Sequence, residues 1–224
     1  MLEIIGMTVE DAKIIEDCGA DRIELVSALT EGGLTPSFGL IESVVNSVKI
    51  PVNVMIRPHA KSFVYSKEDI NIMLKDINIV KEIGANGVVF GMLDKNNNID
   101  EENLNFLLQY CDNLAVTFHR AIDESNTIES VNILKDYDRI TNILTSGGKG
   151  SIRGNIEIIK DMMLNSDNIK ILLGGGLNFN NIVEIKEVTK ANNFHFGTAV
   201  RIDKNPFKDI DRQKLKQLVD IISK

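Results

Sequence analysis

The chain has 224 residues, of which 43% are hydrophobic, and no Pro-rich or Ser-rich linker divides it. We therefore expect a single domain over residues 1–224 with one sizeable core. The formal net charge is −7 and the basic residues are scattered singly, which argues against a partner that is nucleic acid or an anionic membrane. No apolar stretch reaches the roughly 18 to 20 residues of a membrane span and no signal-peptide pattern is present, so we expect a cytoplasmic protein.

Strand-like apolar runs alternate with segments that can each hold a helix. The runs lie near residues 2, 22, 52, 87, 114, 141, 170 and 194. Thr8 is the expected N-cap of the first helix, and Gly19 and Gly84 are expected to end helices. Eight such units in roughly 200 to 250 residues predict an α/β fold of the TIM (β/α)8 barrel type. An open doubly wound sheet is the alternative, but the first strand lacks the glycine motif that binds phosphate in that fold.

Two insertions follow strands and interrupt this regular alternation. Residues 27–39 follow the second strand, and residues 59–66 follow the third. Because both lie on the side where strands lead into helices, we expect them to cover the barrel mouth. Thr35 and Pro36 are expected to begin the next helix, and His59 is expected on a solvated loop.

The most informative segment is residues 117–123, which places His119, Arg120 and Asp123 at the end of a buried strand. Catalytic groups of α/β proteins occupy such strand ends. An alternative is that Arg120 and Asp123 only pair with each other and that His119 is a core histidine. Because other strands also carry or end in ionisable groups, we predict a catalytic set. It comprises Glu24, Arg57, His119, Arg120, Asp123 and His195.

Glycine-containing turns follow the sixth, seventh and eighth strands. They predict an anion-binding set made of Ser146, Gly147, Gly174, Gly175, Gly197 and Thr198. TIM barrels commonly bind phosphate there through backbone N–H groups, although glycine also occurs simply because tight turns need it. Arg57 and Arg120 have the planar geometry that suits a carboxylate or phosphate. The expected partner is therefore a small anionic ligand.

The candidate cofactor is a divalent metal or copper. Candidate ligands are Glu3, Glu24, His119 and His195, whose oxygen and nitrogen donors suit zinc or manganese. No closely spaced histidine pair supports this reading. The two cysteines, Cys18 and Cys111, are too few for a disulfide framework. We expect both to be inert buried thiols away from the mouth.

Several motifs together resemble one known family. They are Ala20 to Leu25, Glu31 to Ser37, Val54 to Pro58, Phe63 to Ser66, Gly87 to Gly91, Val116 to Asp123 and Ile143 to Gly148. In these segments the chain resembles the CutC copper homeostasis proteins. The resemblance covers nearly the whole chain and implies a cytoplasmic TIM barrel that forms a homo-oligomer and acts in copper homeostasis. It also implies mouth positions at Glu3, Glu24, Arg57, His119, Arg120, Asp123 and His195.

The chain departs from that family at positions relevant to copper. Many relatives carry cysteine where this chain has Ile5 and Val26. Because Cu(I) prefers thiolate ligands, we expect weak Cu(I) binding there. Residues 57–63 also lack two glycines and an acidic residue that relatives carry in this loop. Three functions stay open: copper homeostasis, an enzyme that acts on a phosphorylated or carboxylated metabolite by acid/base chemistry, and a catalytically silent binding module.

Overall fold

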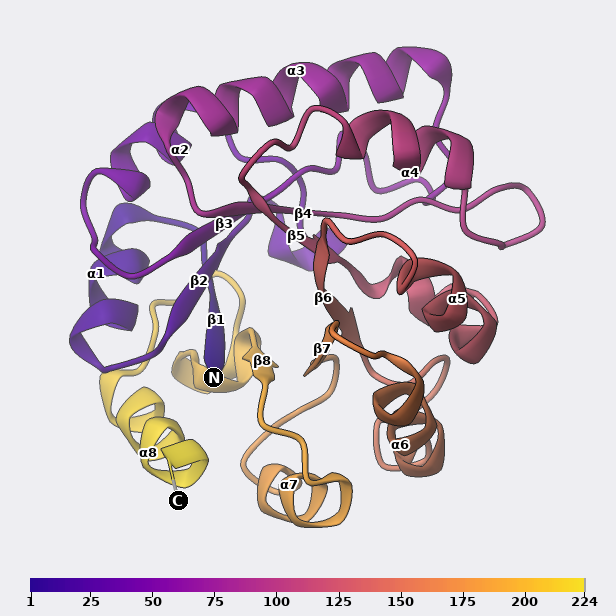
Figure 1. The fold of residues 1–224 in the computed structure, drawn as a ribbon. Helices are drawn as coiled ribbons and strands as arrows, with labels where there is room; N and C mark the ends of the chain where they lie inside the picture. The colour runs from indigo at the N-terminus through magenta and orange to yellow at the C-terminus, as the bar shows by residue number, and fades with distance from the viewer. Residues whose placement is uncertain (224) are drawn as a thin grey trace.

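The protein is described by a computed structural model, which covers residues 1–223 (Figure 1). Parallel strands pair in chain order, and β8 pairs with β1 to close a barrel. The strands are β1 Leu2–Gly6, β2 Arg22–Leu25, β3 Val52–Met55, β4 Gly87–Phe90, β5 Ala115–Phe118, β6 Ile140–Thr145, β7 Lys170–Leu173 and β8 Phe194–Phe196. The predicted TIM barrel is confirmed, and closure of the sheet rules out the open alternative.

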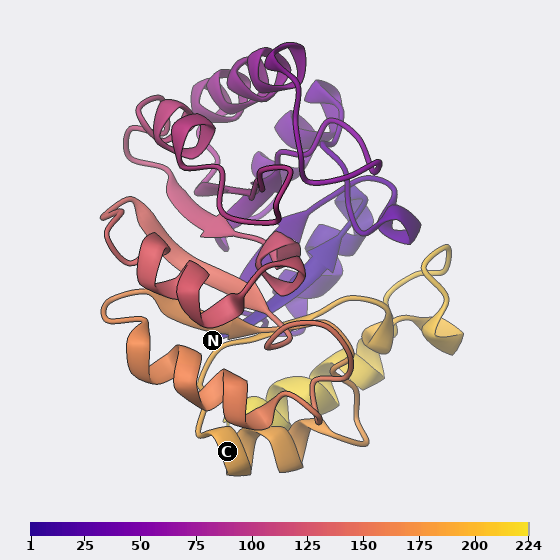
Figure 2. The same cartoon turned by 90° about the vertical axis from the view of Figure 1, so that its right-hand side faces the viewer.

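Helices surround the strands in Figure 1 and form the outer layer of the barrel. They are α1 Val9–Asp17, α2 Phe38–Val45, α3 Lys67–Ile83, α4 Glu101–Leu108, α5 Thr127–Leu134, α6 Ile156–Asn165, α7 Ile182–Thr189 and α8 Arg212–Ser223. Short 3-10 helices follow three of the strands. They are η1 Leu29–Glu31 after β2, η2 Arg120–Glu124 after β5, and both η3 Thr198–Val200 and η4 Ile202–Lys204 after β8. The yellow segment between β8 and α8 projects beyond the barrel in Figure 2.

Capping residues set the helix boundaries. Thr8 accepts a hydrogen bond from the Asp11 N–H at 3.0 Å and begins α1, as predicted. Gly84 ends α3 with a φ of 82°, a left-handed conformation that glycine adopts without strain. The predicted start of α2 was wrong. Ser37 caps that helix, because the hydroxyl of Thr35 instead accepts a hydrogen bond from the Arg57 N–H at 2.9 Å.

The two-residue period of the strands separates two sets of side chains. One set packs with the helices in the main core. The other points inward and includes a small apolar cluster of Ile5, Val26, Met55 and Val89. Buried polar and charged side chains also come from the inward set: Glu3, Arg22, Glu24, Asn53, Thr117, Asn142 and His195. The barrel interior is therefore unusually polar for a packed core, which suits a binding site.

Both cysteines are buried and lie at the C-terminal ends of outer helices. Cys18 is the C-cap of α1, and Cys111 follows α4. Burial raises the pKa of both thiols, that of Cys111 to about 12, so neither provides a thiolate near neutral pH. Across residues 1–223, no helix combines the length and apolar character needed to cross a membrane.

Candidate functional site

A cavity of about 610 Å³ lies at the C-terminal ends of the strands. All six side chains predicted to be catalytic line it: Glu24, Arg57, His119, Arg120, Asp123 and His195. Three predicted anion-binding residues also line it, namely Gly175, Gly197 and Thr198. The other three, Ser146, Gly147 and Gly174, are not among its lining residues. The structure thus brings together residues that lie far apart in the sequence.

Glu24 is the carboxyl group best suited to proton transfer. Its side chain is on β2 and only 2% of the residue is exposed. Its Oε1 has no hydrogen-bond partner among the described residues. Burial raises the pKa of Glu24 to about 7, although the positive charge of His195 opposes that rise. A carboxyl group that titrates near neutral pH can both take and return a proton under ordinary conditions.

His119 is held as a neutral imidazole. It follows β5 as the N-cap of η2, where its Nδ1 accepts a hydrogen bond from the Ala121 N–H at 3.2 Å. Burial lowers the pKa of His119 to about 3, and the Arg57 cation contributes to that lowering. Because Nδ1 is an acceptor, the proton of the neutral ring is on Nε2, which has no partner within residues 1–223. His119 therefore offers an uncharged hydrogen-bond donor.

His195 connects Glu24 to a buried ion pair. Its Nδ1 lies 2.7 Å from Oε1 of Glu3, and its Nε2 lies 3.7 Å from Oε2 of Glu24. The other oxygen of Glu3 accepts a hydrogen bond from Nε of Arg22. Burial disfavours a charged His195, but the carboxylates of Glu24 and Glu3 outweigh this effect and raise its pKa. Glu3 does not line the cavity, so it supports the site through His195.

The predicted metal ligands only partly come together. Ligand atoms of Glu3, Glu24 and His195 lie within 4.8 Å of one another, whereas His119 is not part of this group. Both Glu3 oxygens are already bound, one by His195 and one by the guanidinium of Arg22. A divalent cation would lie beside that guanidinium and would repel it. The arrangement therefore fits a hydrogen-bonded network of protein side chains better than a metal centre.

Arg57 holds the first insertion over the mouth. Its Nη1 donates to the carbonyl oxygens of Glu31 at 2.7 Å and of Gly33 at 3.2 Å. Its guanidinium also lies 4.9 Å from the ring centroid of Phe63, which comes from the second insertion. Through Nη1 and the face of the guanidinium, Arg57 positions both loops as well as adding positive charge to the cavity, while its buried Nε has no hydrogen-bond partner among the described residues.

Asp123 occupies the turn that was predicted to bind an external anion. Its carboxylate accepts hydrogen bonds from the N–H groups of Ser146 and Gly148, both at 3.1 Å. The hydroxyls of Thr145 and Ser146 donate to it as well. The Gly147 N–H donates to Thr145 instead. The turn after β6 therefore binds a carboxylate of the chain itself, and Ser146 and Gly147 are structural in this conformation.

Arg120 is a fixed cation at the edge of the cavity. Its Nε donates to Asp123 at 2.7 Å and its Nη2 to the Ser146 hydroxyl at 3.1 Å. The pairing of Arg120 with Asp123 is thus real, yet the Arg120 side chain is 48% exposed and still lines the cavity. A Cβ at residue 175 would lie 2.5 Å from Cζ of Arg120, so the absence of a side chain at Gly175 leaves room for the guanidinium.

Other glycines also make room for site residues. A Cβ at Gly174 would lie 3.1 Å from Cδ2 of His195, and one at Gly197 would lie 2.9 Å from Cδ1 of Ile5. Gly174 therefore leaves room for the imidazole ring of His195, which explains why glycine is needed at this position. Near Thr198, the cavity wall is completed by Lys204 from the segment between β8 and α8.

Some lining residues were missed from the sequence. Ile5 and Met55 line the cavity because they point inward from β1 and β3, a position that strand alternation alone could have indicated. Lys204 comes from an irregular segment without a recognisable motif. His59 also differs from the expectation of a solvated loop residue, because its Nε2 lies 3.4 Å from Oδ2 of Asp69 and its ring packs on Tyr65.

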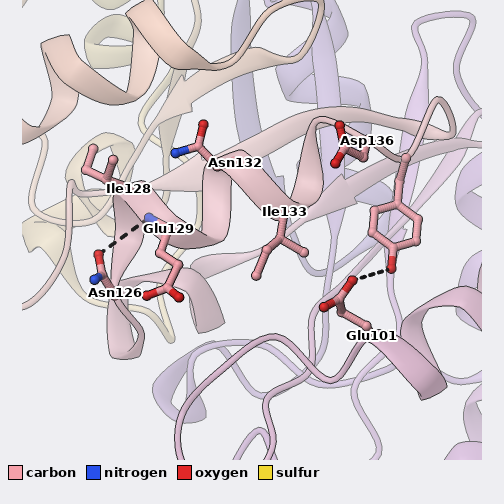
Figure 3. Close-up of a pocket in the computed structure, with 8 residues that line it drawn as sticks. Glu101, Asn126, Ile128, Glu129, Asn132, Ile133 and Asp136 are labelled. Atoms are coloured by element: carbon pink, nitrogen blue, oxygen red, sulfur yellow. Dashed lines mark hydrogen bonds between the residues drawn. The ribbon is translucent and has the colours of Figure 1, made fainter.

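A second hollow lies on the outer layer between α4 and α5 (Figure 3). Glu101 accepts a hydrogen bond from the Tyr137 hydroxyl at 3.0 Å, and Glu129 and Asp136 add further acidic groups. None of the ionisable side chains in this hollow is buried. It lacks the buried, unpartnered polar atoms of the mouth and is therefore the weaker candidate.

Known proteins of one family are similar to this chain. The model of the CutC family matches residues 1–200. A CutC family protein from Pasteurella multocida is 36% identical over 210 residues, which are 92% of this chain and 85% of the relative. The human copper homeostasis protein cutC homolog is 40% identical over 200 residues, which are 87% of this chain and 72% of the relative.

Solved structures show the same relationship. A structure described as CutC from Streptococcus agalactiae has a TM-score of 0.81 and 32% sequence identity, and covers 88% of this chain and 97% of its own. Phosphoribosyl anthranilate isomerase from Thermotoga maritima has a TM-score of 0.67 with 15% identity over 99% of this chain and 98% of its own, a likeness of fold alone. By its family-model match, its relatives and its structure, this chain belongs to the CutC family.

Proposed function

We propose that the mouth binds a small phosphorylated or carboxylated metabolite and moves a proton on it. The observation that carries this proposal is the presence of two buried groups of different protonation behaviour on the wall of one cavity. Glu24 has a pKa of about 7, and His119 is a neutral donor with a free Nε2–H among the described residues. Two ionisable groups whose surroundings shift their pKa values apart in this way are typical of acid/base sites.

In this proposal Glu24 and His119 have different roles. Glu24 takes a proton from the ligand through Oε1, and the ligand keeps the electron pair of the broken bond. His119 donates a hydrogen bond from Nε2 to the oxygen on which negative charge develops. A neutral donor suits this role, because it stabilises the developing charge and keeps its own proton. The ligand class that fits is an anion with an acidic C–H next to a carbonyl group.

The anionic group of the ligand would bind on the side of the cavity formed by β7 and β8. Arg120 supplies a half-exposed guanidinium there, and Lys204 lies along the same cavity. The same side of the cavity is lined by the backbone of Gly175, Gly197 and Thr198. Positive side chains together with backbone N–H groups favour phosphate or carboxylate.

Copper homeostasis is the role named for the human and mouse relatives, and we propose it for this chain as well. Ile5 and Val26 lie in an apolar cluster beside the mouth, where a thiolate would be needed to hold Cu(I). We therefore propose that the role in copper homeostasis depends on chemistry at the mouth. Cytoplasmic location and homo-oligomer formation are further parts of the proposal and rest on the family resemblance.

The test is proton exchange on a library of phosphorylated and carboxylated metabolites in D2O, followed by NMR. We expect the protein to exchange a carbon-bound proton of at least one anion for deuterium. Glu24→Gln should abolish that exchange, whereas Glu42→Gln, on the exposed face of α2, should retain it. Absence of exchange across the library, or exchange that survives Glu24→Gln, would contradict the proposal.

A further inference from the structure

One wall of the cavity consists largely of hydrocarbon. Four of its lining side chains are apolar and come from β1, β3 and the segments that follow β2 and β3: Ile5, Leu29, Met55 and Phe63. Ile5 and Met55 belong to the small apolar cluster inside the barrel, and Leu29 packs against that cluster. These three side chains therefore form one continuous apolar surface. We call the four residues together the apolar wall.

Phe63 extends the apolar wall to His119 and Arg57. Its ring centroid lies 4.9 Å from that of the His119 imidazole in an edge arrangement, and the Arg57 guanidinium lies 4.9 Å from the Phe63 centroid. The Phe63 carbonyl accepts a hydrogen bond from the Leu93 N–H at 2.8 Å, which ties the segment after β3 to the barrel. Because Phe63 is only partly buried and lines the cavity, its ring can contact a ligand.

The apolar wall lies next to Glu24 and across the cavity from the anionic side. Ile5 is the strand partner of Glu24. The Arg120 guanidinium lies against Gly175, which follows β7. In the closed order of the barrel β7 is opposite β3, the strand that carries Met55. A ligand that contacts both sides therefore has hydrocarbon near Glu24 and its charge near Arg120.

We propose that the mouth selects an organic anion whose carbon skeleton is a compact hydrocarbon, in preference to a sugar or another hydroxylated chain. This ligand class rests on the proposed function of the site and narrows it. The hydrocarbon lies against the apolar wall, with the acidic C–H beside Glu24. The phosphate or carboxylate lies beside Arg120.

The physical reason is the different free energy of burying hydrocarbon and hydroxyl groups. Hydrocarbon gains binding free energy when it leaves water, whereas a hydroxyl buried against apolar side chains loses its hydrogen bonds to water without replacement. The other charged groups nearby offer little to a hydroxylated chain. Nη1 of Arg57 already donates to two backbone carbonyls, and Glu31 is exposed to solvent. The cavity, about 610 Å³, has a size typical of small-molecule sites.

The selectivity can be measured with two anions that share one charged group. Butyl phosphate and glycerol phosphate are both phosphate monoesters with short chains, but only glycerol phosphate carries hydroxyls. Isothermal titration calorimetry gives the Kd of each, and we expect butyl phosphate to bind at least about 10-fold more tightly. Equal affinities would overturn the proposal, while the anion-binding function would stand. Failure of both anions to bind would contradict the proposed function itself.

Variants test whether the apolar wall causes this preference. Leu29 is half-buried in the short helix η1, and we expect Leu29→Gln to fold and to reduce the preference for butyl phosphate by about 5-fold. Met55→Gln, of similar side-chain volume, should act in the same direction. Leu164→Gln is the matched control, because Leu164 is 81% exposed on α6, and it should retain the full preference. An undiminished preference in folded Leu29→Gln, or an equal loss in Leu164→Gln, would overturn the proposal.

Discussion

Nε2 of His195 lies 3.7 Å from Oε2 of Glu24, while its Nδ1 is bound to Glu3 at 2.7 Å. One imidazole thus joins the carboxyl group that faces the cavity to one that lies beneath it. Burial raises the pKa of Glu24 to about 7 although His195 lies beside it, whereas Glu3, which is equally buried, has a pKa lowered by Arg22 and His195. The negative charge of Glu3 is compensated by Arg22 and His195. One carboxyl oxygen of Glu24, in contrast, has no hydrogen-bond partner among the described residues.

Replacement of Gly91 should displace His119. A Cβ at this position would lie 2.6 Å from Nδ1 of the imidazole. We expect Gly91→Ala to destabilise the protein by about 1–3 kcal/mol and to reduce proton exchange. Gly39→Ala in α2 is the matched control, because apart from its chain neighbours and the backbone of its own helix no atom lies within 4 Å of its added Cβ. Urea unfolding of both variants checks the prediction, and a Gly91→Ala protein with wild-type stability would contradict it.

Asp123 should be essential for the turn after β6. Its carboxylate accepts from two backbone N–H groups, two hydroxyls and the Arg120 guanidinium. In Asp123→Asn an amide N–H would face some of these donors, and we expect a loss of about 2–4 kcal/mol in the free energy of unfolding. The exposed Asp138→Asn should change stability by less than about 0.5 kcal/mol. Equal stabilities of the two variants would argue against the anchoring role.

His119 should make the protein less stable in acid. Its pKa is about 3 in the folded protein and 6.5 in the reference state, so the unfolded chain binds more protons between these values. Stability attributable to this group is present above pH 6.5 and is lost as the pH falls toward 3. The slope is at most about 1.4 kcal/mol per pH unit. His119→Asn retains an acceptor for the Ala121 N–H and should show a shallower decrease between pH 6.5 and 4 in urea unfolding. A slope identical to that of the wild type would contradict a neutral His119.

Cu(I) binding at the mouth should be weak. Competition with a Cu(I) chelator should show no tight site in the wild type, since Ile5 and Val26 are apolar. The double variant Ile5→Cys and Val26→Cys should gain affinity, because it introduces two thiols into the same cluster. Tight stoichiometric uptake that survives loss of both Cys18 and Cys111 would show that histidine or methionine ligands, such as Met55, supply a copper site.

The barrel was predictable because its signals are local and repeated. Each short apolar run indicated a strand, and all eight runs coincide with strands of the structure within about two residues. Glu24, Arg57, His119 and His195 could be placed at the mouth because strand ends converge in this fold. The predicted start of α2 at Thr35 was wrong, because the Thr35 hydroxyl accepts a hydrogen bond from the N–H of Arg57, which lies 22 positions away and leaves no local signal in the sequence.

The partners of the site residues could not be predicted. Ser146 and Gly147 formed a convincing anion-binding turn, but the anion is Asp123, 23 positions before Ser146 in the chain. The glycines that admit Arg120 and His195 likewise became interpretable only with coordinates. Such contacts depend on packing between strands that are distant in sequence, which a single sequence does not encode in a local pattern.

The protonation of Glu24 is measured most directly by NMR of protein carrying carbon-13 in its glutamate carboxyl groups. We expect one carboxyl signal to titrate near pH 7, well above the ordinary value of 4.5, and to disappear in Glu24→Gln. Glu42→Gln should leave that signal in place. Titration of every glutamate carboxyl group near or below 4.5 would contradict a proton-transfer role for Glu24.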